Sequence, residues 1–410
     1  MIPRWPSADS SARPTVVVAH GAGAYDNATT ALRSLDLSPV RGKRVLLKPN
    51  VGRVGVPGSG ITTHPDVVAA AIDVFRDAGA EVAVGESPIV GVRMRDAFEA
   101  AGMTSIAGPR DCLLIDMDRR RFVEIPVPGG RVIHSLKACP EVLEFDFVVS
   151  VPVMKMHMHT GVSLAVKNMK GCLWRKSKVQ LHALPPVEGS HEKPIDIALA
   201  DLASVLRPSL AIIDGTVGME GLGPSAGQAK PMDVVVVSSD AFAADAVACQ
   251  LMGTEARRIP HLRMGAARGY GVVESDRLIV SPDNWRDWIS PFAPPPANLT
   301  IEFPNITVLD RAACSACQST LVLFLRRHKD RVFDYFPGRS TLHIAIGGGH
   351  KELPEGTLCI GNCTSEHRGV GVFVPGCPPV GSQVLEALSG KPTIDAARGN
   401  GSPSDADACD

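Results

Sequence analysis

Five cysteines lie close together in the last quarter of the chain, and their spacing suits metal binding. They occur in Cys314-Ser-Ala-Cys317, in Cys359-Ile-Gly-Asn-Cys363 and in Val-Pro-Gly-Cys377-Pro-Pro. Two thiolates separated by two residues can bind one metal from a single turn, and later cysteines on Gly- and Pro-rich loops can complete a tetrahedral set. The pattern favours a 4Fe-4S cluster. Its predicted ligands are Cys314, Cys317, Cys363 and Cys377.

Another metal or a set of disulfides is the alternative for these cysteines. Cys359 is the alternate cluster ligand, because its neighbours Leu358 and Ile360 are typical of a strand. Zinc commonly uses two CxxC pairs, whereas the second pair here is CxxxC and the last cysteine stands alone. Disulfides are the weakest interpretation, because the other cysteines are scattered and we find no secretory signal.

The composition excludes several classes of protein. The chain has 410 residues, a net charge of −1, 45% hydrophobic residues and 21% charged residues. A charge so close to zero argues against a nucleic-acid binder, and the length predicts more than one domain. No uninterrupted apolar run reaches the roughly 18 residues that a membrane span requires. We therefore expect a cytoplasmic protein, in a reducing location that suits free thiols and a cluster.

The segments that must position these residues alternate between short β-branched runs and helical patterns. This alternation predicts an α/β fold: a mostly parallel, Rossmann-like open sheet covered by helices, plus a smaller C-terminal α+β domain that carries the cysteines. Residues 65–78 begin with Pro65 and have one apolar face, as expected of an amphipathic crossover helix. Strands are expected at 15–19, 44–48, 81–85, 145–151, 210–214 and 234–238, further helices at 196–206 and 240–252, and a hairpin at 121–133 with its turn at 128–130.

A proline-rich segment divides the chain. Residues 290–298 include three consecutive prolines, which can neither continue a helix nor donate hydrogen bonds within a sheet. We place the α/β body at 14–289, as one or two lobes, and the iron–sulfur-binding domain at 299–390. Residues 1–13 and 391–410 are rich in Ser, Pro, Gly and Asp, and both ends are expected to be disordered.

One segment of the body, residues 155–182, carries only positive charge. It contains six Lys or Arg residues and three His residues, and no acidic residue. Such cations, with nearby hydroxyls and free helix N–H groups, can bind a carboxylate or a phosphate. Lys167 follows three apolar residues, so its stem should be packed and its pKa lowered towards acid–base use. A solvated helix face and a nucleic-acid patch are the alternatives, although only Trp174 could stack on a base.

Polar residues at the ends of the expected strands complete the candidate site. In an open α/β sheet, ligands bind at the carboxyl ends of the strands. The candidate catalytic residues are Lys167, His157 and Asp214, although turn and cap roles explain Asp214 equally well. The candidate substrate-binding residues are Lys48, Asn50, His64, Lys155, His159, Thr160, Ser163 and His182.

Six short motifs mark the body. They are Lys48-Pro49-Asn50, Thr62-Thr63-His64-Pro65, Gly85-Glu86-Ser87-Pro88, the run from Val151 to His157, the run from Thr160 to Gly171, and the run from Asp214 to Pro224. Together they resemble the DUF362 family over about residues 40–270. The resemblance implies an iron–sulfur-associated protein of undefined activity. Many members carry ferredoxin-type CxxCxxCxxxC repeats, which this chain lacks, so its own cysteines predict one cluster.

A shorter motif has a second resemblance. His157, Gly161, Ser163 and Lys167 have the spacing of a segment in the nickel-pincer lactate racemase family, in which a His and a Lys ten residues apart contact the cofactor. His182 falls near a third functional position. The resemblance spans some thirty residues and implies shared ancestry of the fold, without the nickel cofactor.

Three functions follow from these residues. The leading one is a 4Fe-4S enzyme of the redox type that acts on a small anionic substrate in a cationic pocket, with an electron-donor protein as partner. The second is a racemase-like, isomerising or dehydrating enzyme that uses His and Lys as acid and base, or an open iron. The third is a non-catalytic electron-transfer protein. Neither nucleic acid nor a membrane is an expected partner.

Overall fold

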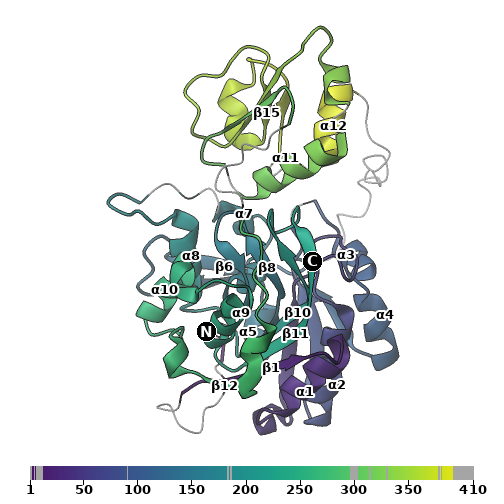
Figure 1. Cartoon of the computed structure of the whole chain (residues 1–410), viewed down its shortest axis with the longest axis vertical. Helices are drawn as coiled ribbons and strands as arrows, with labels where there is room; N and C mark the ends of the chain where they lie inside the picture. The colour runs from purple at the N-terminus through teal and green to yellow at the C-terminus, as the bar shows by residue number, and fades with distance from the viewer. Residues whose placement is uncertain are drawn as a thin grey trace, which may run out of the picture. The chain divides into compact units, whose positions relative to one another are not determined.

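The computed structural model describes most of the chain, which divides into two compact units, Met1–Pro296 and Ala297–Asp410. The described residues exclude 1, 4, 6–12, 90, 182–183, 185–186, 296–302, 314, 329–330, 377–378, 380 and 391–410. The expected tail at 391–410 and residues 296–298 of the expected linker at 290–298 therefore lie outside them. We call the first unit the body and the second the cysteine unit (Figure 1).

The body contains one mixed sheet in which ten described strands pair in the order β12-β1-β11-β10-β7-β2-β3-β4, with β8 attached to β10 and β9 attached to β8. Most neighbours are parallel, as expected, but β11 runs antiparallel to both β1 and β10. The strands are β1 (Thr15–His20), β2 (Arg44–Pro49), β3 (Glu81–Glu86), β4 (Leu113–Asp116), β7 (Phe147–Val151), β8 (Val153–His157), β9 (Gly161–Ser163), β10 (Leu210–Glu220), β11 (Gln228–Ser238) and β12 (Ile279–Ser281).

Helices cover both faces of this sheet, because residues that alternate along a buried strand point to opposite sides. Ile212 of β10 packs with α1 and α2, whereas its neighbour Ile213 packs with α9 and α10. Figure 1 shows α1 and α2 beside each other. The helices of the body are α1 (Ala24–Arg33), α2 (Pro65–Asp77), α3 (Met94–Ala100), α4 (Met103–Ala107), α5 (Glu141–Glu144), α6 (Ala165–Asn168), α7 (Ser177–Gln180), α8 (Pro194–Leu202), α9 (Ala241–Leu251) and α10 (Pro260–Ala267).

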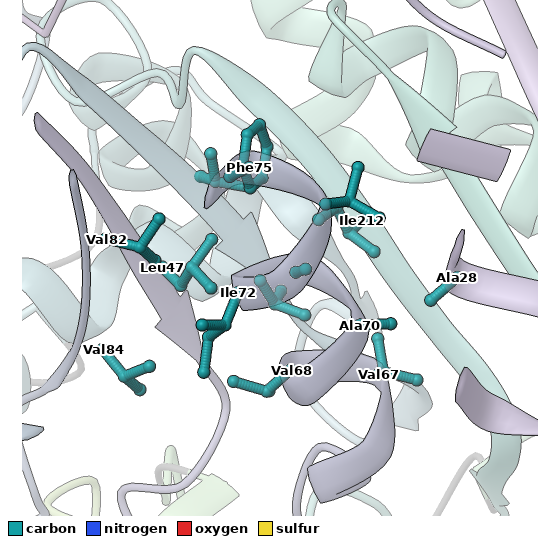
Figure 2. Packing of buried hydrophobic residues seen from close by; sticks show 14 of the residues in the cluster. Ala28, Leu47, Val67, Val68, Ala70, Ile72, Phe75, Val82, Val84 and Ile212 are labelled. Carbon is teal, nitrogen blue, oxygen red and sulfur yellow. The ribbon is translucent and has the colours of Figure 1, made fainter. Parts of the chain in front are cut away.

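Helix α2 shows how the expected crossover helix is fixed. Pro65 stands in its first turn, and the His64 side chain accepts a hydrogen bond from the Asp66 N–H, which caps the helix. Phe75 is fully buried in the cluster between α2 and the sheet (Figure 2). Burial of a side chain of this size contributes about 1.5–3 kcal/mol, so the apolar face holds α2 on the sheet.

A hairpin with the expected turn is present, although its second strand lies beyond residue 133, where the hairpin was expected to end. The start of the chain also differs from expectation. Strands β5 (Val123–Pro126) and β6 (Ser135–Ala138) pair antiparallel, with Gly129 at φ 71° in the turn. Within residues 1–13, which we expected to be disordered, Ile2 is buried, and its N–H donates to the Val205 carbonyl. Disorder is therefore wrong for this residue, since an apolar side chain near the end of a chain can still join the core.

The cysteine unit is built on a separate parallel sheet of four described strands. Strands β13 (Ile306–Asp310), β14 (Leu342–Ile346), β15 (Leu358–Ile360) and β16 (Phe373–Val374) pair in sequence order. Its helices are α11 (Ser315–His328) and α12 (Gly381–Ser389). Short 3-10 helices occur in both units, at η1 (Ser38–Val40), η2 (Gly108–Arg110), η3 (Met169–Cys172), η4 (Ala256–Arg258), η5 (Ser275–Arg277), η6 (Asp283–Trp288), η7 (Val332–Tyr335) and η8 (Asn362–His367). Among the described residues, no helix has the length and hydropathy needed to cross a bilayer.

Candidate functional site

Lys48 forms a buried ion pair where β2 ends. Its Nζ lies 2.8 Å from each carboxylate oxygen of Glu86, the last residue of β3, and the two side chains are 1% and 2% exposed. Nζ also donates to Asn168 Oδ1 at 3.1 Å and to the Pro49 carbonyl at 3.0 Å. A Cβ at position 171 would lie 2.5 Å from Nζ, which explains Gly171. Lys48 thus ties β2, β3 and α6 together.

Lys155, on β8, contacts Asn50, another residue of the candidate substrate-binding set. Its Nζ donates to Asn50 Oδ1 at 2.7 Å, to the Ile61 carbonyl, and to the Pro224 carbonyl at 3.5 Å. The residue is 3% exposed. Burial lowers the pKa of Lys155 to about 7, and repulsion from Arg53 adds to this effect. The ammonium group therefore has three oxygen acceptors in a site that disfavours its charge.

Lys167, on α6, is a second lysine with a lowered pKa. Burial, followed by repulsion from Lys155, lowers the pKa of Lys167 to about 7, while the negative charge of Asp196 opposes this shift. Its half-buried side chain places Nζ 3.5 Å from Ser163 Oγ. Among the residues that the structure describes, neither Lys155 nor Lys167 forms an ion pair.

Helix α6 is held from both ends by buried polar groups. At its start, the two side-chain oxygens of Asp245 on α9 accept the N–H groups of Ala165 at 2.7 Å and Val166 at 3.0 Å. At its end, Asn168 Nδ2 donates to the Lys48 carbonyl and to Ser150 Oγ, each at 3.0 Å. These anchors fix the turn that carries Lys167.

Arg53 is a functional candidate that the sequence reasoning missed. It lies in the loop after β2, half-buried, and burial lowers its pKa. Its charge also lowers the pKa of both Lys155 and Lys167. Its place in the glycine-rich loop that follows Asn50 could have identified Arg53 as a candidate from the sequence. Three cations thus influence one another at the ends of β2 and β8.

Asp214 and His64 are also brought together, in a capping arrangement. Asp214 Oδ2 accepts the His64 N–H at 2.7 Å, and Oδ1 accepts the Thr216 N–H at 2.9 Å. Burial raises the pKa of Asp214, although these N–H groups oppose that shift. The His64 ring caps α2 through Nδ1. Both oxygens of Asp214 therefore bind backbone, as the turn-and-cap interpretation predicts.

His157 lies at the end of β8, where the chain turns. Its side chain is buried, and Nδ1 accepts the N–H groups of His159 at 3.1 Å and Thr160 at 3.4 Å. Thr160 Oγ1 donates to the Val162 carbonyl, and His159 is half-buried in the turn. His157 thus shapes the turn between β8 and β9. The predicted site residue His182 lies outside the described residues.

In the cysteine unit, the predicted ligands follow the carboxyl ends of parallel strands. Cys314 and Cys317 follow β13 in the chain, Cys363 follows β15, and Cys377 follows β16. Parallel strands place all such ends at one edge of a sheet. Cys317 is buried and Cys363 is exposed, whereas Cys314 and Cys377 lie outside the described residues. No group of three metal-binding side chains occurs among the described residues.

Three of these loops converge at Gly361. Around the position that a Cβ of Gly361 would take lie Cys317 Sγ at 3.2 Å, the Gly376 carbonyl oxygen at 3.6 Å and Pro379 Cδ at 3.9 Å. Gly361 has φ 93°, a conformation that L side chains rarely adopt. Asp310 shapes the first loop, since it accepts the Ala313 N–H at 3.1 Å.

Cys359 has a different environment. It lies within β15, as its neighbours predicted, and is fully buried. Its Sγ lies 3.8 Å from the carbonyl oxygens of Thr357 and His367. Burial raises the pKa of this thiol, which disfavours the thiolate that metals bind.

The fold and these side chains define an α/β protein with a cation-rich site at its strand ends and a separate thiol-bearing unit. Residues 45–250, half of the chain, match the model of a domain of unknown function, DUF362. The chain belongs to this family, as its motifs predicted. A thylakoid-associated protein of Synechocystis is 28% identical over 254 residues, which are 60% of this chain and 76% of that protein.

Solved structures show weaker similarity. The lactate racemase apoprotein from Thermoanaerobacterium thermosaccharolyticum has a TM-score of 0.40 and 12% identity, over 84% of this chain and 73% of that one. A Thermotoga maritima protein has a TM-score of 0.35 and 13% identity, over 60% of each chain. These similarities are too low to bear on function.

Proposed function

We propose that the body is an enzyme that binds a small anionic substrate near Arg53, Lys155 and Lys167 and moves a proton with Lys167. The observation that carries this proposal is the pair of lysines with pKa values of about 7 and no ion-pair partner among the described residues. Lysines at exposed positions have a pKa near 10.4, so this pair is tuned to physiological pH.

The two lysines take different roles. Lys155 has three oxygen acceptors, which matches the three hydrogens of an ammonium group, so it keeps its proton and supplies positive charge. Lys167 has only the hydroxyl of Ser163 within hydrogen-bonding distance among the described residues. With Lys155 charged, repulsion favours the neutral amine of Lys167, which is the form that can accept a proton.

We further propose that Cys314, Cys317, Cys363 and Cys377 hold a 4Fe-4S cluster. The convergence of the Cys317, Gly361 and Gly376 segments supports this ligand set. Four cysteine ligands saturate the cluster and suit it for electron transfer. A redox reaction with an electron-donor protein, in the cytoplasm, is therefore the function we favour. Acid–base isomerisation without redox is the second candidate, which the lysine pair favours.

Anion binding tests the role of the lysines. Titration calorimetry of the full chain with inorganic phosphate and with oxalate should detect binding at pH 7 that weakens as the pH rises, because ammonium is lost above the pKa. Lys155→Met should weaken binding at least tenfold. Lys167→Met should weaken it less, because the neutral amine supplies no charge. Lys176→Met, at an exposed position of the same segment, should leave it unchanged. Equal binding by all three variants would contradict the proposal.

Metal analysis tests the cysteine unit. Anaerobically purified protein should contain about four iron and four sulfide per chain and give a reduced-cluster signal in electron paramagnetic resonance after dithionite treatment. One zinc per chain without sulfide would overturn the cluster and the redox function. The acid–base proposal for the body would then stand alone.

A further inference from the structure

Two of the cysteine-bearing loops are joined by a pair of hydrogen bonds. The Asn362 backbone N–H donates to the Gly376 carbonyl at 2.7 Å, and the Gly376 N–H donates to the Asn362 side-chain Oδ1 at 2.8 Å. Asn362 directly precedes Cys363, and Gly376 directly precedes Cys377. Asn362, the neighbour of Cys363, therefore binds both the N–H and the carbonyl of Gly376, the neighbour of Cys377.

The geometry on each side of this pair is tightly constrained. On one side, the Thr364 hydroxyl and N–H both donate to the Gly361 carbonyl, at 2.8 and 3.0 Å, which closes a turn around Asn362 and Cys363. On the other side, Gly376 has φ 143°, and a Cβ there would lie 2.6 Å from Pro379 Cα. Strand pairing of β15 with β16, which includes a hydrogen bond from the Gly361 N–H to the Val374 carbonyl at 2.8 Å, brings the two loops side by side. The two hydrogen bonds between Asn362 and Gly376 extend that contact to the residues next to the predicted ligands.

Of these two hydrogen bonds, only one depends on a side chain. The bond from the Asn362 N–H survives any substitution except proline, but the bond to Oδ1 needs an oxygen acceptor at that position. Asn362 is exposed and contributes nothing to the apolar core of the unit. Apolar packing therefore does not account for its position against Gly376.

We propose that Asn362 is a positioning residue of the metal centre, whose side chain holds the Cys363 loop against Gly376, the residue that precedes the predicted ligand Cys377. This inference rests on the proposed 4Fe-4S cluster. Residues that orient metal ligands, without binding the metal themselves, commonly change metal affinity 10- to 100-fold when they are replaced.

The test compares three variants of the full chain. Asn362→Ala removes the acceptor, Asn362→Asp keeps an oxygen acceptor, and Ser365→Ala changes a side chain in the same short helix, η8, that forms no hydrogen bond among the described residues. The readouts are iron and sulfide content after anaerobic reconstitution, and the rate of iron loss to a chelator. Thermal unfolding in the absence of iron checks that each variant folds.

Asn362→Ala should lose iron about tenfold faster or more than the wild type, with unchanged unfolding of the iron-free protein. Asn362→Asp should retain the cluster and lower its reduction potential, because a negative charge then lies beside it. Ser365→Ala should match the wild type. If Asn362→Ala also matches the wild type, the positioning role is wrong and the cluster stands. If the wild type itself binds no iron and sulfide, both proposals are overturned.

Discussion

His261 on α10 and Asp196 on α8 form a buried pair, with Nδ1 of the imidazole 3.3 Å from Oδ1 of the carboxylate and neither side chain more than 2% exposed. Burial lowers the pKa of His261, so the ring is neutral and donates to the carboxylate through Nδ1. Its Nε2 has no hydrogen-bond partner among the described residues. The negative charge of Asp196 raises the pKa of Lys167.

Removal of that charge should change the titration of Lys167. We expect Asp196→Asn to lower the pKa of Lys167 below its value of about 7, because burial and repulsion from Lys155 then act unopposed. Nuclear magnetic resonance titration of isotope-labelled lysine side chains measures this pKa directly. Glu192→Gln is the control, since that carboxylate pairs with the partly exposed Arg263. An unchanged pKa in Asp196→Asn would show that the two groups are not coupled.

The buried Lys48–Glu86 pair should be costly to break from one side. Glu86→Gln leaves the Lys48 ammonium without a counter-charge at 1% exposure, and such a loss typically destabilises a protein by about 3–5 kcal/mol. Denaturant unfolding of the single variants and of the Lys48→Met/Glu86→Gln double variant measures the coupling. The double variant should be more stable than Glu86→Gln alone. The exposed Arg33–Asp77 pair is the matched control, where Asp77→Asn should have no measurable effect.

The Asp245 carboxyl should make stability depend on pH. Burial raises its pKa to about 8, far above the value of about 3.9 expected in the unfolded chain. The folded state therefore retains a proton that the unfolded state has lost, and the stability from Asp245 is fully present below about pH 4 and is lost as the pH rises through 8. The contribution to the slope is at most about 1.4 kcal/mol per pH unit.

Asn at position 245 cannot titrate, although it keeps only one oxygen acceptor for the N–H groups of Ala165 and Val166. Asp245→Asn should therefore flatten the fall in unfolding free energy between pH 4 and pH 8, as measured by urea unfolding at a series of pH values. Asp283→Asn, at an exposed position, is the control, and its unfolding free energy should depend on pH as in the wild type. A steep profile that persists in Asp245→Asn would assign the pH dependence to another group.

Gly361→Ala should damage the metal centre. The added Cβ would sit 3.2 Å from Cys317 Sγ on a residue with φ 93°, so either the thiol or the loop must move. We expect iron and sulfide content to fall by half or more after reconstitution. Gly381→Ala is the matched control, because nothing lies within 4 Å of its added Cβ. Full iron content in Gly361→Ala would mean that the loop tolerates the shift.

Local patterns in the sequence were enough to predict the crossover helix and most strands of the sheet. Pro65 and a single apolar face located α2 to within a residue of its end. Strand β10 was expected to stop at Asp214, but it continues to Glu220, because pairing with β8 and β11 outweighs the low strand preference of Gly215 and Gly218.

The candidate site was predictable only in part. The sequence placed Lys155 and Asn50 in one candidate substrate-binding set, and the structure joins them at 2.7 Å. It did not reveal that Asp245 anchors the turn of Lys167, because that contact depends on how α9 packs, eighty residues away. Asp245 is the one acidic residue in the mostly apolar helix α9, and this could have marked it in the sequence as a buried anchor.

The order of strands in the body has a consequence for synthesis of the protein. Strand β1 is made before the other described strands of its sheet, but its two partners are β11 and β12, and β12 ends at Ser281. At about 5–20 residues per second, a ribosome needs roughly 10–50 s to make the intervening chain. During that time the apolar segment from Val16 to Ala19 has no strand to pair with. The first strand to emerge is thus among the last to be protected, and aggregation of nascent chains should begin there.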